Sequence, residues 1–274
     1  MTVHMSMACL VCMTISIVAC TGGGGSDASL CGARSAILGG TPVTASVQPD
    51  VGMLIYTDDA RAPELVCTGT VIGPRAVLTA AHCVVLLGAT VPDFTLAENE
   101  NELASDRVHR GLRIHVHPRF ALTAADGLKH DLAILELSTP IDAFTAAALP
   151  TPDEAAPYLR VGASTELVGY GATDAQGTNV GVENIASAAI TELTDEEFVV
   201  GGSGPVQNCE GDSGGPSLAP AASYRPRFLL GVVSRSRVEG GACRDGAVHI
   251  RVDTNRSWIV EVNQRIEARS EEEC

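Results

Sequence analysis

Apolar residues along most of the chain occur in short runs that are interrupted by glycine, proline, aspartate and asparagine. These runs are rich in Val, Ile and Leu and have the length of β-strands. Helical spacing is rare until the C-terminal end, where one apolar stripe is formed by Trp258, Ile259, Val262 and Ile266. The pattern predicts an all-β protein with one terminal helix, a sandwich or a pair of barrels. The expected strands are Val51–Tyr56, Gly69–Ile72, Ala76–Leu78, Gly111–His115, Leu132–Leu137, Glu166–Gly169, Phe228–Val233 and Val248–Val252.

A proline-rich and acidic stretch, Leu149–Pro157 (LPTPDEAAP), divides the body into two halves and is typical of a linker. We therefore expect an N-terminal barrel at about 37–150 and a C-terminal barrel at about 157–256. The terminal helix is expected at about 257–269, with Ser257 as its N-cap.

The first residues have the pattern of an export signal. Met7–Ala19 is apolar but too short to span a bilayer, and no later stretch is long and apolar enough. Ile17–Cys20 resembles the lipobox of bacterial lipoproteins, in which the cysteine is acylated, and residues 21–36 form a glycine-rich tether and pro-segment. Residues 1–20 are thus predicted to be a signal, ending either in lipidation of Cys20 or in an ordinary cleavage. The protein would be a lipoprotein of the bacterial outer membrane or periplasm, or would be secreted.

Charge and cysteine content narrow the class of protein. The 274 residues include 18 Lys and Arg against 33 Asp and Glu, a net charge of −15, which argues against nucleic-acid binding. The same balance argues against docking on an anionic lipid surface, so any membrane contact would be through the lipid anchor. The nine cysteines contain one C-x-x-C pair, Cys9 and Cys12, which lies within the predicted signal, so disulfides are favoured over a metal site in the body of the chain. Six of them follow the signal, an even number that allows 15 connectivities.

Three short segments carry the residue types that acyl-transfer chemistry needs, namely Leu78–Cys83 (LTAAHC), His130–Leu135 (HDLAIL) and Cys209–Pro216 (CEGDSGGP). A serine hydroxyl is a weak nucleophile and needs a histidine base, which needs a carboxylate to fix its tautomer. Ser213, His82 and Asp131 supply that set. Gly211 allows a tight turn, so that its N–H and that of Ser213 can both face a developing oxyanion.

Together these segments resemble the signatures of the trypsin/chymotrypsin family of serine peptidases, in the family's order and near its spacing. The resemblance extends from Ile37 to about Ile266 and implies a peptidase domain over 37–274 with two antiparallel six-stranded β-barrels. It places the active site in the cleft between the barrels.

The resemblance also implies a role for each residue. His82 would be the general base and acid, Asp131 would orient it, and Ser213 would be the nucleophile. Gly211 and Ser213 would supply the oxyanion hole, and Ser234 would support Asp131. We expect a serine endopeptidase that hydrolyses protein or peptide substrates through an acyl-enzyme intermediate, without a cofactor or a metal, as a monomer.

Disulfide pairing follows from the same resemblance. It implies one bridge beside the histidine, Cys67–Cys83, and one across the specificity pocket, Cys209–Cys243. By parity the remaining pair would be Cys31–Cys274.

Ile37-Leu38-Gly39-Gly40 resembles the family's activation site, where cleavage frees an isoleucine α-amine that pairs with the aspartate before the nucleophile, here Asp212. The preceding residue is Ala36 and not Arg or Lys. Either the activating protease prefers small residues, or Ile37 is freed by trimming, or activation differs. This departure, with a crowded pocket, motivates the alternative of a non-catalytic or zymogen-like binding protein on the same fold.

The specificity pocket departs from the trypsin branch as well. Six residues before the nucleophile that branch has Asp, whereas this chain has Gln207, followed by Asn208. Ser236 and Ala247 occupy wall positions that usually carry glycine, so a shallower pocket is expected. A neutral amide floor predicts small to medium uncharged side chains in the substrate, and not trypsin-like cleavage.

Other polar residues near the motifs have less specific interpretations. Arg235 stands where the family usually has a tryptophan, and Glu210 at the rim should disfavour acidic substrate residues. The acidic segment Ala97–Asp106 could hold calcium, but a solvated loop is the favoured interpretation. His117 is interpreted as structural and not as a metal ligand.

Overall fold

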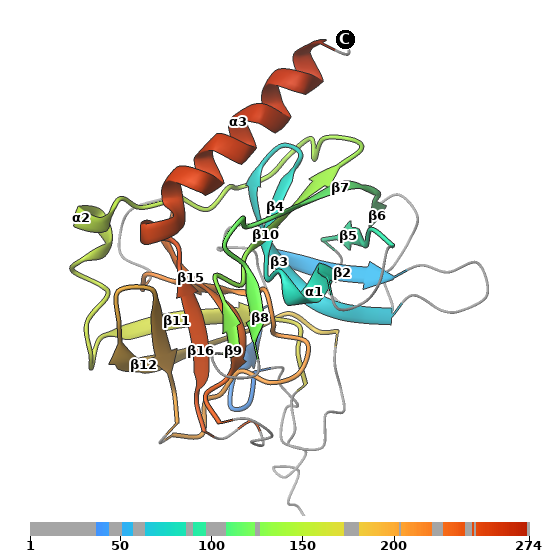
Figure 1. Cartoon of the computed structure of the whole chain (residues 1–274). Helices are drawn as coiled ribbons and strands as arrows, with labels where there is room; N and C mark the ends of the chain where they lie inside the picture. The colour runs from blue at the N-terminus through green and yellow to red at the C-terminus, as the bar shows by residue number, and fades with distance from the viewer. Residues whose placement is uncertain are drawn as a thin grey trace, which may run out of the picture. The chain divides into compact units, whose positions relative to one another are not determined.

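A computed structural model describes residues 37–43, 51–56, 64–85, 90–96, 108–123, 127–172, 181–202, 204–220, 227–238, 243 and 245–272. All described elements belong to one compact unit, Ala33–Cys274 (Figure 1). Cys20, the tether, the Cys31–Cys274 pair and the acidic segment at 97–106 lie outside the described residues, so the predictions made for them stay predictions.

The first sheet is antiparallel and has the strand order β6-β5-β2-β3-β4-β10-β7. Its strands are β2 (Val51–Tyr56), β3 (Glu64–Gly73), β4 (Ala76–Thr79), β5 (Asp93–Thr95), β6 (Val108–His109), β7 (Gly111–Val116) and β10 (Ala133–Leu137). The edge strands β6 and β7 are separated only by Arg110. The continuous chain therefore brings the two edges together, and the sheet is a nearly closed barrel.

The second sheet is a closed ring of antiparallel strands. Its order is β1-β12-β11-β14-β15-β16-β13, and an additional β12–β13 pairing closes six of these strands. The strands are β11 (Ser164–Gly169), β12 (Asn184–Leu193), β13 (Glu197–Val200), β14 (Pro216–Leu218), β15 (Leu229–Ser236) and β16 (Ala247–Arg251). The short strand β1 (Thr41–Pro42) pairs with β12, so the start of the described chain joins the second barrel and not the first.

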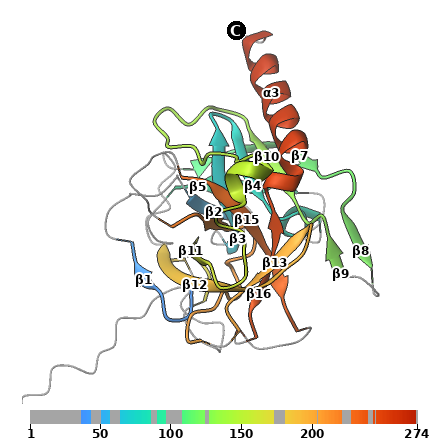
Figure 2. The same ribbon diagram turned by 90° about the vertical axis from the view of Figure 1, so that its left-hand side faces the viewer.

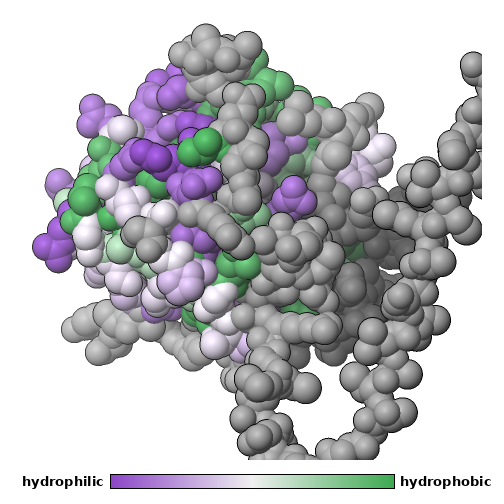
Figure 3. Space-filling view, turned by 90° about the horizontal axis from the view of Figure 1, so that it is seen from below, coloured by the Kyte–Doolittle hydropathy of each residue, from purple (hydrophilic) through white to green (hydrophobic). Residues whose placement is uncertain are grey.

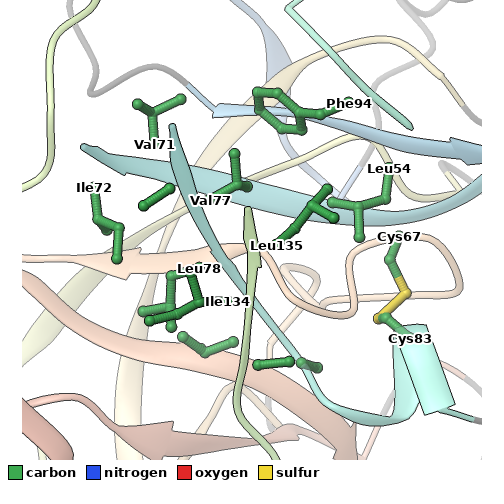
Figure 4. Close-up of a cluster of buried hydrophobic side chains, with 14 of the residues drawn as sticks. Leu54, Cys67, Val71, Ile72, Val77, Leu78, Cys83, Phe94, Ile134 and Leu135 are labelled. Carbon is green, nitrogen blue, oxygen red and sulfur yellow. A yellow bond between two sulfur atoms is a disulfide. The ribbon is translucent and has the colours of Figure 1, made fainter. Parts of the chain in front are cut away.

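The core explains why these sequence runs form strands. Inside the first barrel, apolar side chains from neighbouring strands point toward one another, among them Leu54, Val77, Phe94 and Leu135 (Figure 4). All four are completely buried. A smaller cluster that includes Phe198 and Leu230 fills the second barrel. The predicted all-β fold of two antiparallel barrels is thus confirmed.

The C-terminal helix is confirmed, with one correction. Helix α3 (Arg256–Glu272) follows a 3-10 turn, η2 (Asp253–Asn255), without a break, so Ser257 lies inside the helix and its predicted N-cap role is wrong. In the predicted apolar stripe Ile259, Val262 and Ile266 are buried and Trp258 is partly buried, and all four pack in a cluster that includes the core of the first barrel. The predicted linker contains a short helix, α2 (Pro152–Ala155), which begins with a capping box.

A separate two-stranded hairpin, β8 (Ala121–Thr123) and β9 (Gly127–Lys129), immediately precedes His130 and Asp131 (Figure 2).

Seen from below, hydrophilic residues gather at one side of the described surface, and apolar ones occur in small groups between them (Figure 3). None of the helices in the described ranges combines the length and the apolar character that crossing a bilayer requires.

Candidate active site

His82 and Asp131 form a direct pair between two strands of the first barrel. His82 opens the short helix α1 (His82–Val85) after β4, and Asp131 is completely buried just before β10. The Nδ1 atom of His82 lies 2.7 Å from Oδ2 of Asp131, and the His82 backbone N–H donates to Oδ1 at 2.8 Å. A carboxylate only accepts, so the imidazole carries its hydrogen on Nδ1 and leaves Nε2 as the basic atom.

Ser234 links this pair to the second barrel. Its hydroxyl, on β15, donates to Oδ2 of Asp131 at 2.6 Å. The residue before it, Val233, exchanges backbone hydrogen bonds with Gly214 and Gly215, which follow Ser213. The contacts of β15 therefore hold Asp131 and the Ser213 loop against the same strand.

Strand β3 provides a second connection between Ser213 and His82. The Thr68 N–H donates to the Ser213 carbonyl at 2.8 Å. Next to Thr68, Cys67 is bridged to Cys83, which follows His82 directly. Within these described residues, no hydrogen bond joins His82 Nε2 to the Ser213 hydroxyl; the Nε2 atom lies 3.7 Å from the Cys83 sulfur.

The backbone before Ser213 forms a tight turn over Cys209–Asp212. The Asp212 N–H donates to the Cys209 carbonyl at 3.1 Å, and Gly211 has φ 93°. A positive φ at the third position is what a type II turn requires, and it favours glycine. The Glu210 carbonyl accepts from Ala172 N–H at 2.7 Å. Because a trans peptide directs N–H and C=O oppositely, the Gly211 N–H points away from Ala172.

Asp212 is completely buried and is held by backbone amides. Its Oδ1 accepts from the Gly171 N–H at 2.9 Å and its Oδ2 from the Cys209 N–H at 2.8 Å. Burial raises the pKa of Asp212 to about 7, although these hydrogen bonds and Asn208 oppose the shift. In the intact chain the nitrogen of Ile37 is an amide, and Ile37 is itself completely buried.

A cavity of about 130 Å³ opens beside Ser213. Its lining includes the predicted nucleophile Ser213 and the predicted wall residues Ser236 and Ala247, together with Asn208, Cys209, Glu210, Val233, Arg235 and Cys243. Cys209 and Cys243 are joined in a disulfide. The cavity wall is therefore built from two cross-linked segments of the second barrel.

Gln207, predicted as the floor of this pocket, is not among the residues that line it. Its side-chain oxygen accepts from the N–H groups of Gly202 at 3.2 Å and Gly246 at 3.0 Å, and its nitrogen donates to the Gly204 carbonyl at 3.1 Å. These three hydrogen bonds hold the Gln207 side chain against the backbone of the neighbouring loops. Asn208, the next residue, lines the cavity instead, so the neutral amide on this wall comes from a different residue.

Arg235 also lines the cavity, and its charge has partners. One guanidinium nitrogen donates to the Leu128 carbonyl on β9 and another to Glu197 on β13, both at 2.8 Å. These contacts fasten the β8–β9 hairpin to the second barrel. Sequence reasoning identified Arg235 but missed Glu197, because no local pattern connects two residues that are 38 positions apart on strands separated by β16.

The two described cysteines beside His82 cannot serve as metal ligands, because they are bonded to each other. Ligand atoms of Cys67, His82 and Cys83 lie within 4.8 Å of one another. Both sulfurs are in the Cys67–Cys83 disulfide, so neither is the thiolate that binds metals.

Comparisons with known proteins identify the family. The family model described as Trypsin matches residues 37–259, and the chain therefore belongs to the trypsin family of serine proteases. Phenoloxidase-activating factor 3 of Holotrichia diomphalia is 27% identical over 269 residues, covering 85% of this chain and 74% of that protein.

Two further relatives show the same relationship. Trypsin of Phaedon cochleariae is 29% identical over 217 residues, covering 71% of this chain and 78% of that protein. Melanization protease 1 of Drosophila melanogaster is 26% identical over 258 residues, covering 81% of this chain and 64% of that protein. The resemblance to the trypsin family that the three motifs indicated is thus confirmed.

Proposed function

We propose that this chain is a serine endopeptidase that hydrolyses protein substrates with Ser213, His82 and Asp131. The observation that carries the proposal is the His82–Asp131 pair at 2.7 Å, supported by Ser234. This pair leaves Nε2 of His82 as the basic atom on the side away from Asp131. Strands β3 and β15 both contact the loop of Ser213, and they also connect to this pair through the Cys67–Cys83 disulfide and through Ser234.

The reaction divides into acylation and deacylation. The Ser213 hydroxyl attacks the scissile carbonyl carbon while its proton passes to Nε2 of His82. The carbonyl oxygen becomes an oxyanion that the N–H groups of Gly211 and Ser213 stabilise. His82 then gives the proton to the departing amine, which breaks the peptide bond and leaves an acyl-enzyme. A water molecule, activated by His82 in the same way, releases the acyl group.

The amide of Gly211 is suited to the oxyanion role because the type II turn aims it. The Ala172 contact holds the Glu210 carbonyl on one side of the turn, so that the Gly211 N–H faces the other side. A preorganised donor of this kind costs no reorganisation when charge develops, and losing one costs about 2.7–4 kcal/mol in the transition state.

Activation is proposed to occur by cleavage before Ile37. Leu38 exchanges two backbone hydrogen bonds with Gln207, so the segment after the cut already lies beside the Ser213 loop. A new α-amine would pair with Asp212, whose described partners in the intact chain are uncharged. This pairing would offset the cost of a buried carboxylate and order the turn. Because Ala36 precedes the cut, we propose that the activating protease accepts a small residue there.

The pocket favours short, uncharged side chains. The cavity beside Ser213 is small, and its described lining carries no carboxylate except Glu210. Arg235 is already paired with Glu197, so it offers little free charge to an acidic substrate residue. We therefore propose a preference for small to medium uncharged residues, and not for Arg or Lys.

Two disulfides fit an oxidising compartment, so we propose that the protein is exported and acts there as a monomer on protein substrates. Residues 1–20 would be the export signal, residues 21–36 the tether and pro-segment, and 37–274 the peptidase domain. Lipidation of Cys20 and the bacterial setting it implies rest on the lipobox-like sequence alone.

The decisive experiment compares the wild-type chain with Ser213→Ala and His82→Ala on a peptide library. We expect cleavage after small uncharged residues by the wild type and none by either variant. Equal cleavage by all three would reject the triad. The N-terminus of each preparation is determined by mass spectrometry, and Ile37 is expected there in the active form.

A second candidate function is a zymogen-like binding protein on the same fold. The observation that favours it is that Asp212 of the intact chain has backbone amides for partners, while Ala36 precludes the usual activating cut. An intact chain that binds proteins without cleaving them, and that never acquires Ile37 as its terminus, would support this alternative.

A further inference from the structure

The backbone immediately before Asp131 has a conformation that residues with a side chain rarely adopt. His130 has φ 46°, in the left-handed region. The Leu132 N–H donates to the His130 carbonyl at 2.8 Å, so the chain turns tightly around Asp131. Such a conformation persists only where its surroundings hold it, and it is concentrated at functional sites.

His117 holds His130 from one side. Their rings stack with centroids 5.2 Å apart and planes 21° from parallel. The His117 ring also makes a T-shaped contact with Trp258, on helix α3, with ring centroids 4.8 Å apart. The backbone N–H of His117 donates to the Leu132 carbonyl at 3.0 Å. His117 therefore contacts the turn both through its ring and through its backbone.

The protonation state of His117 suits this stacking. Burial, together with the neighbouring His130 and Arg119, lowers the pKa of His117 to about 4. Its Nδ1 accepts from the Arg119 N–H at 3.2 Å, as a neutral ring nitrogen does. Above its pKa the ring is uncharged, so it stacks on His130 without repulsion between two cations.

The second barrel holds the same turn from the other side. His130 Nε2 lies 3.5 Å from a carboxylate oxygen of Glu196. Two neighbouring contacts, of Lys129 with Glu197 at 3.7 Å and of Arg235 with the Leu128 carbonyl at 2.8 Å, fix the preceding residues. Residues 128–130 are thus anchored to β15, to β13 and to Glu196 just before β13, across the boundary between the barrels.

We propose that His130 is a positioning residue: clamped between His117 and Glu196, its left-handed backbone aims the carboxylate of Asp131 at His82. The inference rests on the proposed function, since it assigns Asp131 the role of orienting His82. Both carboxylate oxygens of Asp131 contact His82, at 2.7 and 2.8 Å, so a small rotation of the turn would break one contact or both. His130 itself touches no reacting atom.

The test uses variants that separate the backbone conformation from the imidazole. Alanine disfavours the left-handed region, whereas glycine and asparagine adopt it readily. We expect His130→Ala to lower kcat about tenfold with KM within about twofold, because a small misplacement of a catalytic group is costly. His130→Gly and His130→Asn should restore kcat to within about threefold of wild type.

An independent pair of variants tests the stack without changing the turn. His117→Ala should lower kcat in the same way as His130→Ala, and His117→Phe, which keeps an aromatic ring, should not. His115→Ala is the matched control: it removes a nearby half-buried histidine that contacts Glu136 and not the turn. It should lower the Tm and leave kcat unchanged.

A spectroscopic readout makes the test independent of turnover. A strong Nδ1–H hydrogen bond to a carboxylate gives a proton NMR signal far downfield. We expect this signal in the wild type, His130→Asn and His130→Gly, and a weakened one in His130→Ala. The proposal is overturned if His130→Ala keeps both the signal and full kcat, or if Gly and Asn lose as much as Ala. Failure of the proposed function is a separate result, namely wild-type turnover equal to that of Ser213→Ala.

Discussion

The hydroxyl of Ser234 is the sharpest probe of the proposed mechanism, because it touches Asp131 but no substrate. It is buried and donates to Oδ2 at 2.6 Å, the same oxygen that faces His82 Nδ1. Ser234→Ala removes this donor and leaves both His82 contacts in place. The substitution deletes a single oxygen atom, so the strand β15 that carries it should keep its pairing.

The expected magnitude follows from the hydrogen bond. A hydrogen bond to a charged group contributes about 1.5–3 kcal/mol, and each 1.36 kcal/mol in a barrier changes a rate about tenfold. If the whole loss is expressed in the transition state, kcat falls about 10- to 150-fold. KM should change little, because Ser234 does not line the substrate cavity.

The assay is steady-state cleavage of the best library peptide by wild type, Ser234→Ala and Ser217→Ala. Ser217 is a matched control: it is equally buried in the same barrel, and its hydroxyl lies 2.8 Å from Nδ1 of His249 and not from Asp131. Ser217→Ala should lower stability by about 1 kcal/mol and spare kcat. Wild-type kcat in Ser234→Ala, or equal losses in the two variants, would refute the reasoning.

Three further predictions test other parts of the structure. The pKa of Asp212 is raised to about 7 in the intact chain, above the ordinary value of 3.8, so the folded state binds the proton more tightly. Relative to Asp212→Asn, the uncleaved wild type should therefore lose stability as pH rises from about 4 to 7, and thermal unfolding of the two proteins across this range measures the difference. Gln207→Asp should not create cleavage after Arg or Lys in the peptide library, but it should lower the Tm, because Gly204 loses its donor. Glu136→Gln should destabilise the protein by about 1–3 kcal/mol in urea without changing kcat, because Glu136 is buried between His115 and Arg269, each 2.7 Å away.

Sequence reasoning could propose candidate catalytic residues because they stand in short local motifs. The residues around His82, Asp131 and Ser213 must form a turn, a strand end and a glycine-rich loop, and each requirement is visible in a few consecutive residues. Most strands of the first barrel were predictable for the same reason, because both ends of a run such as Val51–Tyr56 are marked by turn residues; the short strands β5 and β6 were not predicted. Strand β12 was missed because its alanine-rich sequence, with one face partly exposed, lacks that contrast.

Interactions between distant segments could not be predicted. Whether Gln207 or Asn208 lines the cavity depends in part on Gly246, 39 positions away, whose N–H donates to the Gln207 side chain. The pairing of Arg235 with Glu197 depends on strand order. Ser257 fitted the N-cap preference locally, but the preceding 3-10 turn starts the helix one residue earlier.

The measurement that tests the central claim most directly is labelling of the active form by a fluorophosphonate, with mass spectrometry of the modified peptide. We predict that one label is attached to the Ser213 oxygen and that His82→Ala abolishes the labelling, because the hydroxyl then has no base. A protein that begins at Ile37 and is correctly folded, yet leaves Ser213 unlabelled or is labelled equally without His82, would contradict the account.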